Sequence, residues 1–250
     1  QAPKRSVYDL SSLKTKFLAK YADLLGSYLN GRGAIMSGFD YDYVVIGSGF
    51  GGAVSAMRLS QKGYNVLVLE SGPRTNPKNL PKSNWDIRKF LFMPSLGLKG
   101  IMRADFLGGI MVLSGAGVGG GSLVYANTLI EPESESFKQA AWPEKVGVSS
   151  WFEELKPYYS TAKKMLGVTE SPSKYPADQA MKRSAEKLGY GDSFHSVDVG
   201  VYFGEPGVKH PDPFFNGEGP ERSGCTECGG CMIGCKENAK NTLDKNYLYF

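Results

Sequence analysis

Apolar residues recur at helical spacing within the first 35 residues of the chain. They are Leu10, Leu13, Phe17, Leu18, Tyr21, Leu24, Leu25, Tyr28 and Leu29, and Asn30-Gly31 follows as a stop. The pattern predicts one amphipathic helix in an N-terminal extension over residues 1–36. We expect it to dock on a neighbouring surface rather than a membrane, because Lys14, Lys16 and Lys20 form only a thin basic edge.

The next pattern predicts a strand, a helix and a second strand. An apolar run from Tyr43 to Ile46 leads into a glycine-rich turn, a helical stretch to Lys62 and a second apolar run from Asn65 to Leu69. Two strands joined by a helix in this order form a βαβ unit with parallel strands. The fold class is therefore α/β.

Two later regions have different patterns. The apolar stretch FLFMPSLGLKGIMRADFLGGIMVLSGAGVGG is interrupted by Lys99, Arg103 and Asp105, so it predicts buried loops and short strands rather than a membrane span. Apolar residues at helical spacing predict a helix over 151–166 that includes Pro157, and Pro176 and Gly189 mark the start and stop of another. The alternating run FHSVDVGVYF makes His195 a strand residue of a substrate-binding region.

Composition limits the classes of function. The chain has 250 residues, 41% of them hydrophobic, and a net charge of +4 without a long basic block, so no nucleic-acid partner is indicated. No secretory signal is visible, and a cytoplasmic location is the expectation. The first residue is Gln and the last ten, NTLDKNYLYF, stop within an amphipathic pattern, so we expect both ends to be cut.

The turn Gly47-Ser48-Gly49-Phe50-Gly51-Gly52 carries a GxGxxG spacing. The first glycine permits a tight turn, the second lets the backbone approach a pyrophosphate at a helix N-terminus, and Gly52 lets helix and strand pack closely. Glu70 follows the second strand, where its carboxylate can accept hydrogen bonds from the hydroxyls of an adenosine ribose. This motif alone does not distinguish FAD from NAD.

A second glycine cluster lies in SGAGVGGGSLVYANTLIEP, from Ser114 to Pro132. Bare main chain of this kind offers a surface for a flat ring or a phosphate, or forms a flexible loop.

Both segments together resemble the start of a glucose-methanol-choline (GMC) oxidoreductase, and within that family the bacterial cholesterol oxidase group. The resemblance resumes at LKPYYSTAKKMLGV (155–168) and AKNTLDKNYL (239–248), and it covers most of the chain from about Met36. It implies a Rossmann-like FAD-binding domain over 37–132, the start of an inserted α+β substrate-binding region over 133–220, and a cysteine-rich insertion with a return to the FAD-binding domain over 221–250.

The same resemblance implies the cofactor residues. Gly47, Ser48, Gly49, Phe50, Gly51, Gly52 and Glu70 would hold the ADP part of FAD, and Gly120, Gly121 and Asn127 would line the isoalloxazine. Tyr125 stands where related cholesterol oxidases place Asn.

The implied activity is oxidation of a hydrophobic secondary alcohol, such as a sterol, by hydride transfer to FAD, with oxygen or another electron acceptor. The family's catalytic His and Asn lie in a C-terminal half that this sequence does not contain. We therefore assign no catalytic residue and expect the chain to be inactive alone. A sugar-type or carotenoid-type flavin dehydrogenase and a flavin-carrying electron-transfer subunit are the alternatives.

All four cysteines of the chain lie within eleven residues, CTECGGCMIGC. Cys225, Cys228, Cys231 and Cys235 have the spacing C-x2-C-x2-C-x3-C, which is typical of iron–sulfur ligation. Lys236 stands where bacterial ferredoxins carry Pro, and the last cysteine of such a run usually serves a second cluster. A zinc site and metal-free thiols remain alternatives, whereas disulfides would close only small loops.

Overall fold

The computed structural model describes residues 40–138, 142, 150–172 and 174–250. Contacts divide the chain into Gln1–Asp40 and Tyr41–Phe250, and the description below concerns the second unit. The helix expected over residues 1–36 lies outside the described residues.

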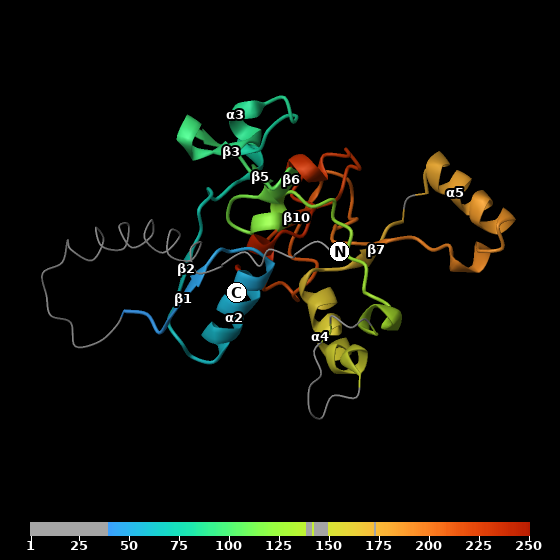
Figure 1. The fold of residues 1–250 in the computed structure, drawn as a ribbon, viewed down its shortest axis with the longest axis horizontal. Coiled ribbons are helices and arrows are strands. Elements are labelled where there is room, and N and C mark those ends of the chain that lie inside the picture. Colours follow the sequence, from blue (N-terminus) through green and yellow to red (C-terminus); the bar gives the residue numbers. More distant parts are fainter. Residues whose placement is uncertain (1–39, 139–141, 143–149, 173) are drawn as a thin grey trace, which may run out of the picture. The chain divides into compact units, whose positions relative to one another are not determined.

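The predicted βαβ unit is present. Strand β1 (Tyr43–Ile46) and strand β2 (Val66–Leu69) pair in parallel, with Tyr43 opposite Val66 and Ile46 opposite Leu69. Helix α2 (Phe50–Gln61) connects them and lies alongside both strands in Figure 1. Ala53 and Ala56 are its buried residues, because small side chains let a helix approach a strand closely.

The apolar stretch after residue 90 forms short strands, as expected, but not all of it is buried. Strands β3 (Phe92–Met93) and β4 (Leu98–Lys99) pair, and β5 (Met102–Leu107) pairs with β6 (Ile110–Gly115) in a longer hairpin. The expectation of burial is wrong at the hairpin tip, where Phe106 is 77% and Ile110 68% exposed. The hairpin turns through Gly108 and Gly109, both at positive φ, and only its base joins the core.

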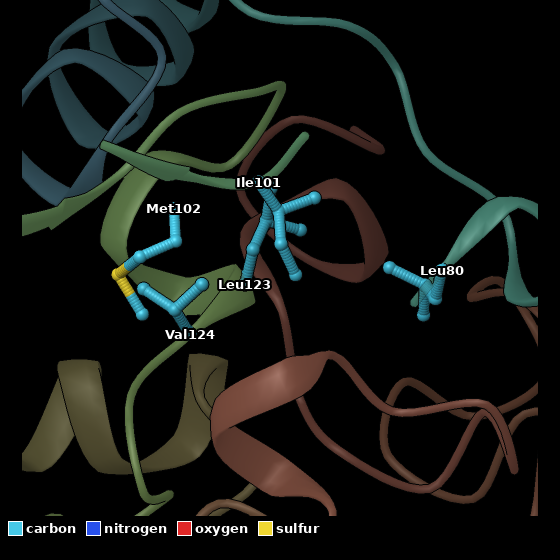
Figure 2. Packing of buried hydrophobic residues seen from close by; sticks show 5 residues of the cluster. All are labelled: Leu80, Ile101, Met102, Leu123 and Val124. Atoms are coloured by element: carbon cyan, nitrogen blue, oxygen red, sulfur yellow. The ribbon is translucent and has the colours of Figure 1, made fainter. Parts of the chain in front are cut away.

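That base contributes to a buried apolar cluster, shown in Figure 2. It consists of Leu80, Ile101, Met102, Leu123 and Val124, with Phe90 packed against it. Phe90 ends the short helix α3 (Ile87–Phe90), and Leu123 ends a 3-10 turn, so the cluster fixes the segment that carries the second glycine cluster.

Both helices predicted after residue 150 are present. Helix α4 (Trp151–Met165) begins after Ser150, whose hydroxyl accepts a hydrogen bond from the N–H of Glu153, and it contains Pro157. Helix α5 (Pro176–Lys187) starts with its proline and is followed by Gly189 at positive φ.

The remaining strands are two residues long. β7 (Thr169–Glu170) pairs with β8 (Asp198–Val199), and β9 (Lys209–His210) with β10 (Arg222–Ser223). The prediction that His195 is a strand residue is wrong, because β8 begins three residues later and His195 is exposed. Its Nδ1 instead lies 3.0 Å from the carbonyl oxygen of Ser193. The 3-10 turns span Pro77–Asn79, Pro94–Leu96, Gly120–Leu123, Ser134–Phe137, Gly191–Ser193, Cys231–Ile233 and Leu243–Lys245.

The last residues of the chain return to the βαβ unit. Leu243 and Tyr247 are buried against Ala53 of α2, with Met57 and Met165 packed around them. The C-terminal segment, which the sequence predicts to return to the FAD-binding domain, therefore packs on the helix of the GxGxxG motif.

Candidate functional site

The glycine turn between β1 and α2 has the steric requirements of a phosphate-binding turn. Gly47 has φ of +91°, and a Cβ on Gly52 would lie 1.9 Å from the carbonyl oxygen of Gly47. A Cβ on Gly49, in contrast, would meet nothing within 4 Å. Gly49 is the N-cap of α2 and provides no side-chain hydrogen bond, and the first turn of the helix contains no acidic residue. The free N–H groups of this first turn therefore favour an anion.

Glu70 anchors this turn from the end of β2. Its Oε2 accepts hydrogen bonds from the N–H and hydroxyl of Ser48 at 2.9 and 2.7 Å. Its Oε1 accepts from the N–H of Gly72 at 3.0 Å and the hydroxyl of Ser71 at 3.3 Å. Burial opposes ionisation, but these bonds outweigh it and lower the pKa of Glu70 below 4.5. Ribose hydroxyls would have to replace the serine hydroxyls, since four bonds fill the carboxylate.

The second glycine cluster touches the first. A Cβ on Gly120 would lie 2.7 Å from the Cα of Gly49, and the N–H of Gly119 donates to the Ser48 hydroxyl at 3.1 Å. The ring of Phe50 lies 3.9 Å from the Cβ position of Gly121. The structure thus brings together all the residues predicted for FAD except Asn127.

The four cysteines line one cavity of about 200 Å³. Asn127, Tyr175 and Lys240 line the same cavity. Three of the four sulfurs accept hydrogen bonds: Cys225 from the N–H of Glu227 at 3.3 Å, Cys231 from the Asn127 amide at 2.9 Å, and Cys235 from the N–H groups of Ala239 and Lys240 at 3.3 and 3.4 Å. The Asn127 amide therefore faces the cysteines, and its assignment to the isoalloxazine stays a prediction.

Two fully buried cations lie beside this cavity. The Nζ of Lys240 donates to the carbonyl oxygens of Leu123, Tyr125 and Cys231 at 2.9, 3.1 and 2.7 Å. Burial lowers the pKa of Lys240 to about 8, against the opposing effect of Cys231 and Cys235. Burial also lowers the pKa of Arg222 to about 10, and its guanidinium donates to the carbonyl oxygens of Asn238, Ala239 and Lys240.

Two of the thiols, Cys225 and Cys231, have shifted pKa values. Burial raises the pKa of Cys225 and Cys231 above 9, and the other thiols add to this effect, while the hydrogen bond from Asn127 lowers that of Cys231. As the side chains stand, no group of three or more His, Cys, Asp or Glu residues in the described part of the chain has the geometry to hold a metal ion.

The comparison with known proteins covers the glycine-rich site and not the cysteine cavity. A family model described as GMC oxidoreductase matches residues 41–204. The chain belongs to the GMC oxidoreductase family. The match contains both glycine clusters and Glu70, whereas the four cysteines lie beyond it.

Relatives of this GMC chain include a cholesterol oxidase of Mycobacterium tuberculosis, 50% identical over 84% of the chain and 36% of the relative. A cholesterol oxidase of Acinetobacter baumannii is 46% identical over 86% of the chain and 39% of the relative. A long-chain-alcohol oxidase of Arabidopsis thaliana is 29% identical over 83% of the chain and 24% of the relative. The chain thus spans well under half the length of these proteins.

The GMC family implies FAD, and the residues fit this cofactor. The space beside Gly49 is open, and the N–H groups in the first turn of α2 have no side-chain cap. The main chain at Gly120 lies against the same glycine turn. None of the described helices is long and apolar enough to cross a membrane.

Sequence reasoning missed three buried polar residues close to the two sites. Ser122 is fully buried; its hydroxyl donates to the carbonyl oxygen of Gly119 and accepts from the N–H of Leu243 at 3.0 Å. Lys240 and Arg222 were also missed, although charged residues next to a glycine- and cysteine-rich segment are a usable signal. Two carbonyl partners of Lys240, those of Leu123 and Tyr125, lie over a hundred residues away, which no spacing in the sequence reveals.

Proposed function

We propose that the protein is an FAD-dependent oxidoreductase that oxidises a hydrophobic secondary alcohol, with a sterol as the substrate. The observation that carries the proposal is the contact of Gly120 with Gly49, which builds one cofactor surface from two segments about seventy residues apart. The two cholesterol oxidase relatives, 50% and 46% identical to the chain, support the sterol class.

FAD, when bound, supplies the hydride acceptor for the alcohol carbon. The described residues bind and orient it. The N–H groups at the start of α2 would face its pyrophosphate. Glu70 would accept hydrogen bonds from the ribose in place of the serine hydroxyls and keep the bond from the Ser48 N–H. The lowered pKa of Glu70 keeps this acceptor ionised at neutral pH. Gly120 and Gly121 leave the flavin ring access to the main chain.

The domain division belongs to the same proposal. Residues 37–132 and the end of 221–250 form the FAD-binding part, since Leu243 and Tyr247 pack on α2. Residues 133–220, which contain α4 and α5, begin the substrate-binding region.

The electron acceptor separates two versions of this function. An oxidase returns the electrons of the reduced flavin to oxygen. A dehydrogenase, or an electron-transfer subunit, passes them through a centre held by the cysteines to a quinone or carrier protein. The cholesterol oxidase relatives support the first version, and the cavity lined by all four thiols is the observation that raises the second.

The first test identifies the cofactor and the reaction. We expect denatured full-length protein to release FAD, identified by chromatography against FAD and NAD standards. Anaerobic addition of cholesterol should reduce that flavin and yield the ketone, whereas the analogue without the hydroxyl group should do neither. Release of a nicotinamide without flavin would overturn the proposal.

A second test addresses Glu70. Glu70→Arg removes the acceptor and places a cation beside the ribose, so we expect purified protein to retain less than a tenth of the wild-type flavin. Glu133→Arg makes the same charge change at an exposed position and serves as the control. Equal flavin occupancy in wild type and Glu70→Arg would refute the role of Glu70.

A further inference from the structure

The four-cysteine loop folds so that its first and last thiols reach the same cavity. Glu227, Gly229 and Gly234 adopt positive φ, and a 3-10 turn begins at Cys231. These reversals let Cys235 line the cavity that Cys225 and Cys228 also line. The fourth cysteine is therefore placed with the other three, and a second cluster is not needed to account for it.

The hydrogen bonds to sulfur suit thiolates better than thiols. A neutral thiol is a weak acceptor, whereas a metal-bound thiolate is a strong one, and such bonds stabilise it. Backbone N–H groups reach Cys225 and Cys235, and the Asn127 amide reaches Cys231 at 2.9 Å. Asn127 adopts φ of +62°, so its backbone is held in a conformation that only Asn and Gly take readily.

The charge around the cavity points to an anionic occupant. Lys240 is 0% and Arg222 2% exposed, and no ion pair among the described residues includes either of them. Buried cations are costly unless a negative charge lies close by. Asp212 and Asp244 lie near enough to Arg222 to offset part of its charge, whereas the groups that offset the charge of Lys240 are Cys231 and Cys235. A metal centre held by the four thiolates would supply the negative charge that Lys240 otherwise lacks.

We propose that Cys225, Cys228, Cys231 and Cys235 bind an iron–sulfur cluster whose negative charge is balanced by Lys240 and Arg222. All four cysteines line one cavity, and their C-x2-C-x2-C-x3-C spacing is typical of iron–sulfur ligation. Zinc held by the same four thiolates is one outcome of the test below.

The cluster site adjoins the proposed flavin loop. The 3-10 turn Gly120–Leu123 packs on the 3-10 turn Cys231–Ile233, and Lys240 joins Leu123 to Cys231 through its ammonium group. A cluster held here would carry the two electrons of the reduced flavin, one at a time, to an external quinone or carrier protein, and the two flavin protons would leave to solvent. This electron step rests on the proposed function, whereas the cluster itself does not.

The test is elemental and spectroscopic. Full-length protein purified anaerobically should contain iron and acid-labile sulfide in near-equal amounts, with a colour that dithionite bleaches. Cys228→Ser alters the exposed cysteine and should remove both iron and sulfide while the flavin stays. Met232→Leu, at an exposed position on the same loop, should keep them. Zinc without sulfide, or neither metal, overturns the cluster.

Two further measurements separate the cluster from the flavin chemistry. Asn127→Gly keeps the backbone conformation but removes the amide donor, so we expect unchanged iron content and a more negative cluster reduction potential; an unchanged potential refutes the role of Asn127. Anaerobic cholesterol should reduce the cluster, seen by electron paramagnetic resonance. Iron and sulfide without flavin overturn the electron step alone, and flavin without iron overturns the cluster while leaving alcohol oxidation intact.

Discussion

The glycine turn at β1 and α2 and the cysteine cavity are two ways of preparing a chain for a cofactor. In the glycine turn, bare main chain forms the surface and side chains are excluded: a Cβ on Gly52 or Gly120 would overlap backbone atoms. In the cavity, cysteine side chains form the surface, and Lys240 and Arg222 are buried nearby. The glycine turn itself depends on local spacing, although Glu70 and Gly120 complete the site from other segments. The cavity combines one stretch from Arg222 to Lys240 with Asn127, about a hundred residues upstream.

The largest expected effect tests the steric half of this contrast. Gly52→Ala places a Cβ 1.9 Å from the Gly47 carbonyl oxygen, so the turn has to move. We expect nearly complete loss of flavin and a loss of about 3 kcal/mol in the free energy of unfolding, measured with urea. Ser60→Ala, at an exposed position near the end of the same helix, is the control and should keep both. If Gly52→Ala retained its flavin, the main chain of the turn could shift to accept a Cβ at this position, and the steric requirement for glycine would be refuted.

A smaller effect tests the electrostatic half. Lys240→Met keeps the length of the side chain but leaves the carbonyl oxygens of Leu123, Tyr125 and Cys231 without their donor. We expect a loss of roughly 2 kcal/mol in the free energy of unfolding of metal-free protein. The loss should be larger in metal-loaded protein, where the charge of the thiolates is left unbalanced.

Lys236→Met, next to the last cysteine and only half-buried, is the control for this prediction. Thermal unfolding of the loaded and stripped forms of both variants provides the measurement. An equal loss in the two forms would mean that Lys240 serves only its carbonyl partners.

The smallest effect concerns the pH dependence of the glycine turn. The pKa of Glu70 is lower in the folded chain than the ordinary value of 4.5, so its carboxylate contributes stability above pH 4.5 and loses it as the pH falls. Flavin-free wild type should therefore be more stable than Glu70→Gln at pH 7, with a difference that shrinks below pH 4.5. Urea unfolding from pH 7 to pH 4 checks this. A difference that stays constant would mean that Glu70 acts through its shape alone.

The two sites also differ in how far the sequence predicts them. The βαβ unit can be predicted from Gly47, Gly49 and Gly52, because their GxGxxG spacing between two apolar runs is a local pattern. Gly47 is needed for its positive φ and Gly52 for the close approach of helix and strand. The bounds of β1 and the start of α5 at Pro176 match for the same kind of reason. The spacing of the cysteines predicts that they act together, and it says nothing of Lys240, two of whose three carbonyl partners lie over a hundred residues away in the chain.

Two expectations were wrong because alternation and apolar content do not specify tertiary partners. His195 belongs to an alternating run, but only Asp198 and Val199 find a pairing strand in Thr169–Glu170. Phe106 and Ile110 are apolar, but the Gly108-Gly109 turn carries them beyond the base of the hairpin that joins the core. The sequence records the propensity of a segment, and the burial depends on what the rest of the chain places beside it.

The packing of Leu243 on Ala53 sets the order of events during synthesis of the chain. The two residues are 190 positions apart, which a ribosome takes roughly 10–40 s to cover at about 5–20 residues per second. Throughout that interval the nascent chain displays the inner face of α2 without its cover, a surface suited to capture by chaperones. A chain released before residue 243 would carry the whole dinucleotide motif and still leave that helix open to aggregation.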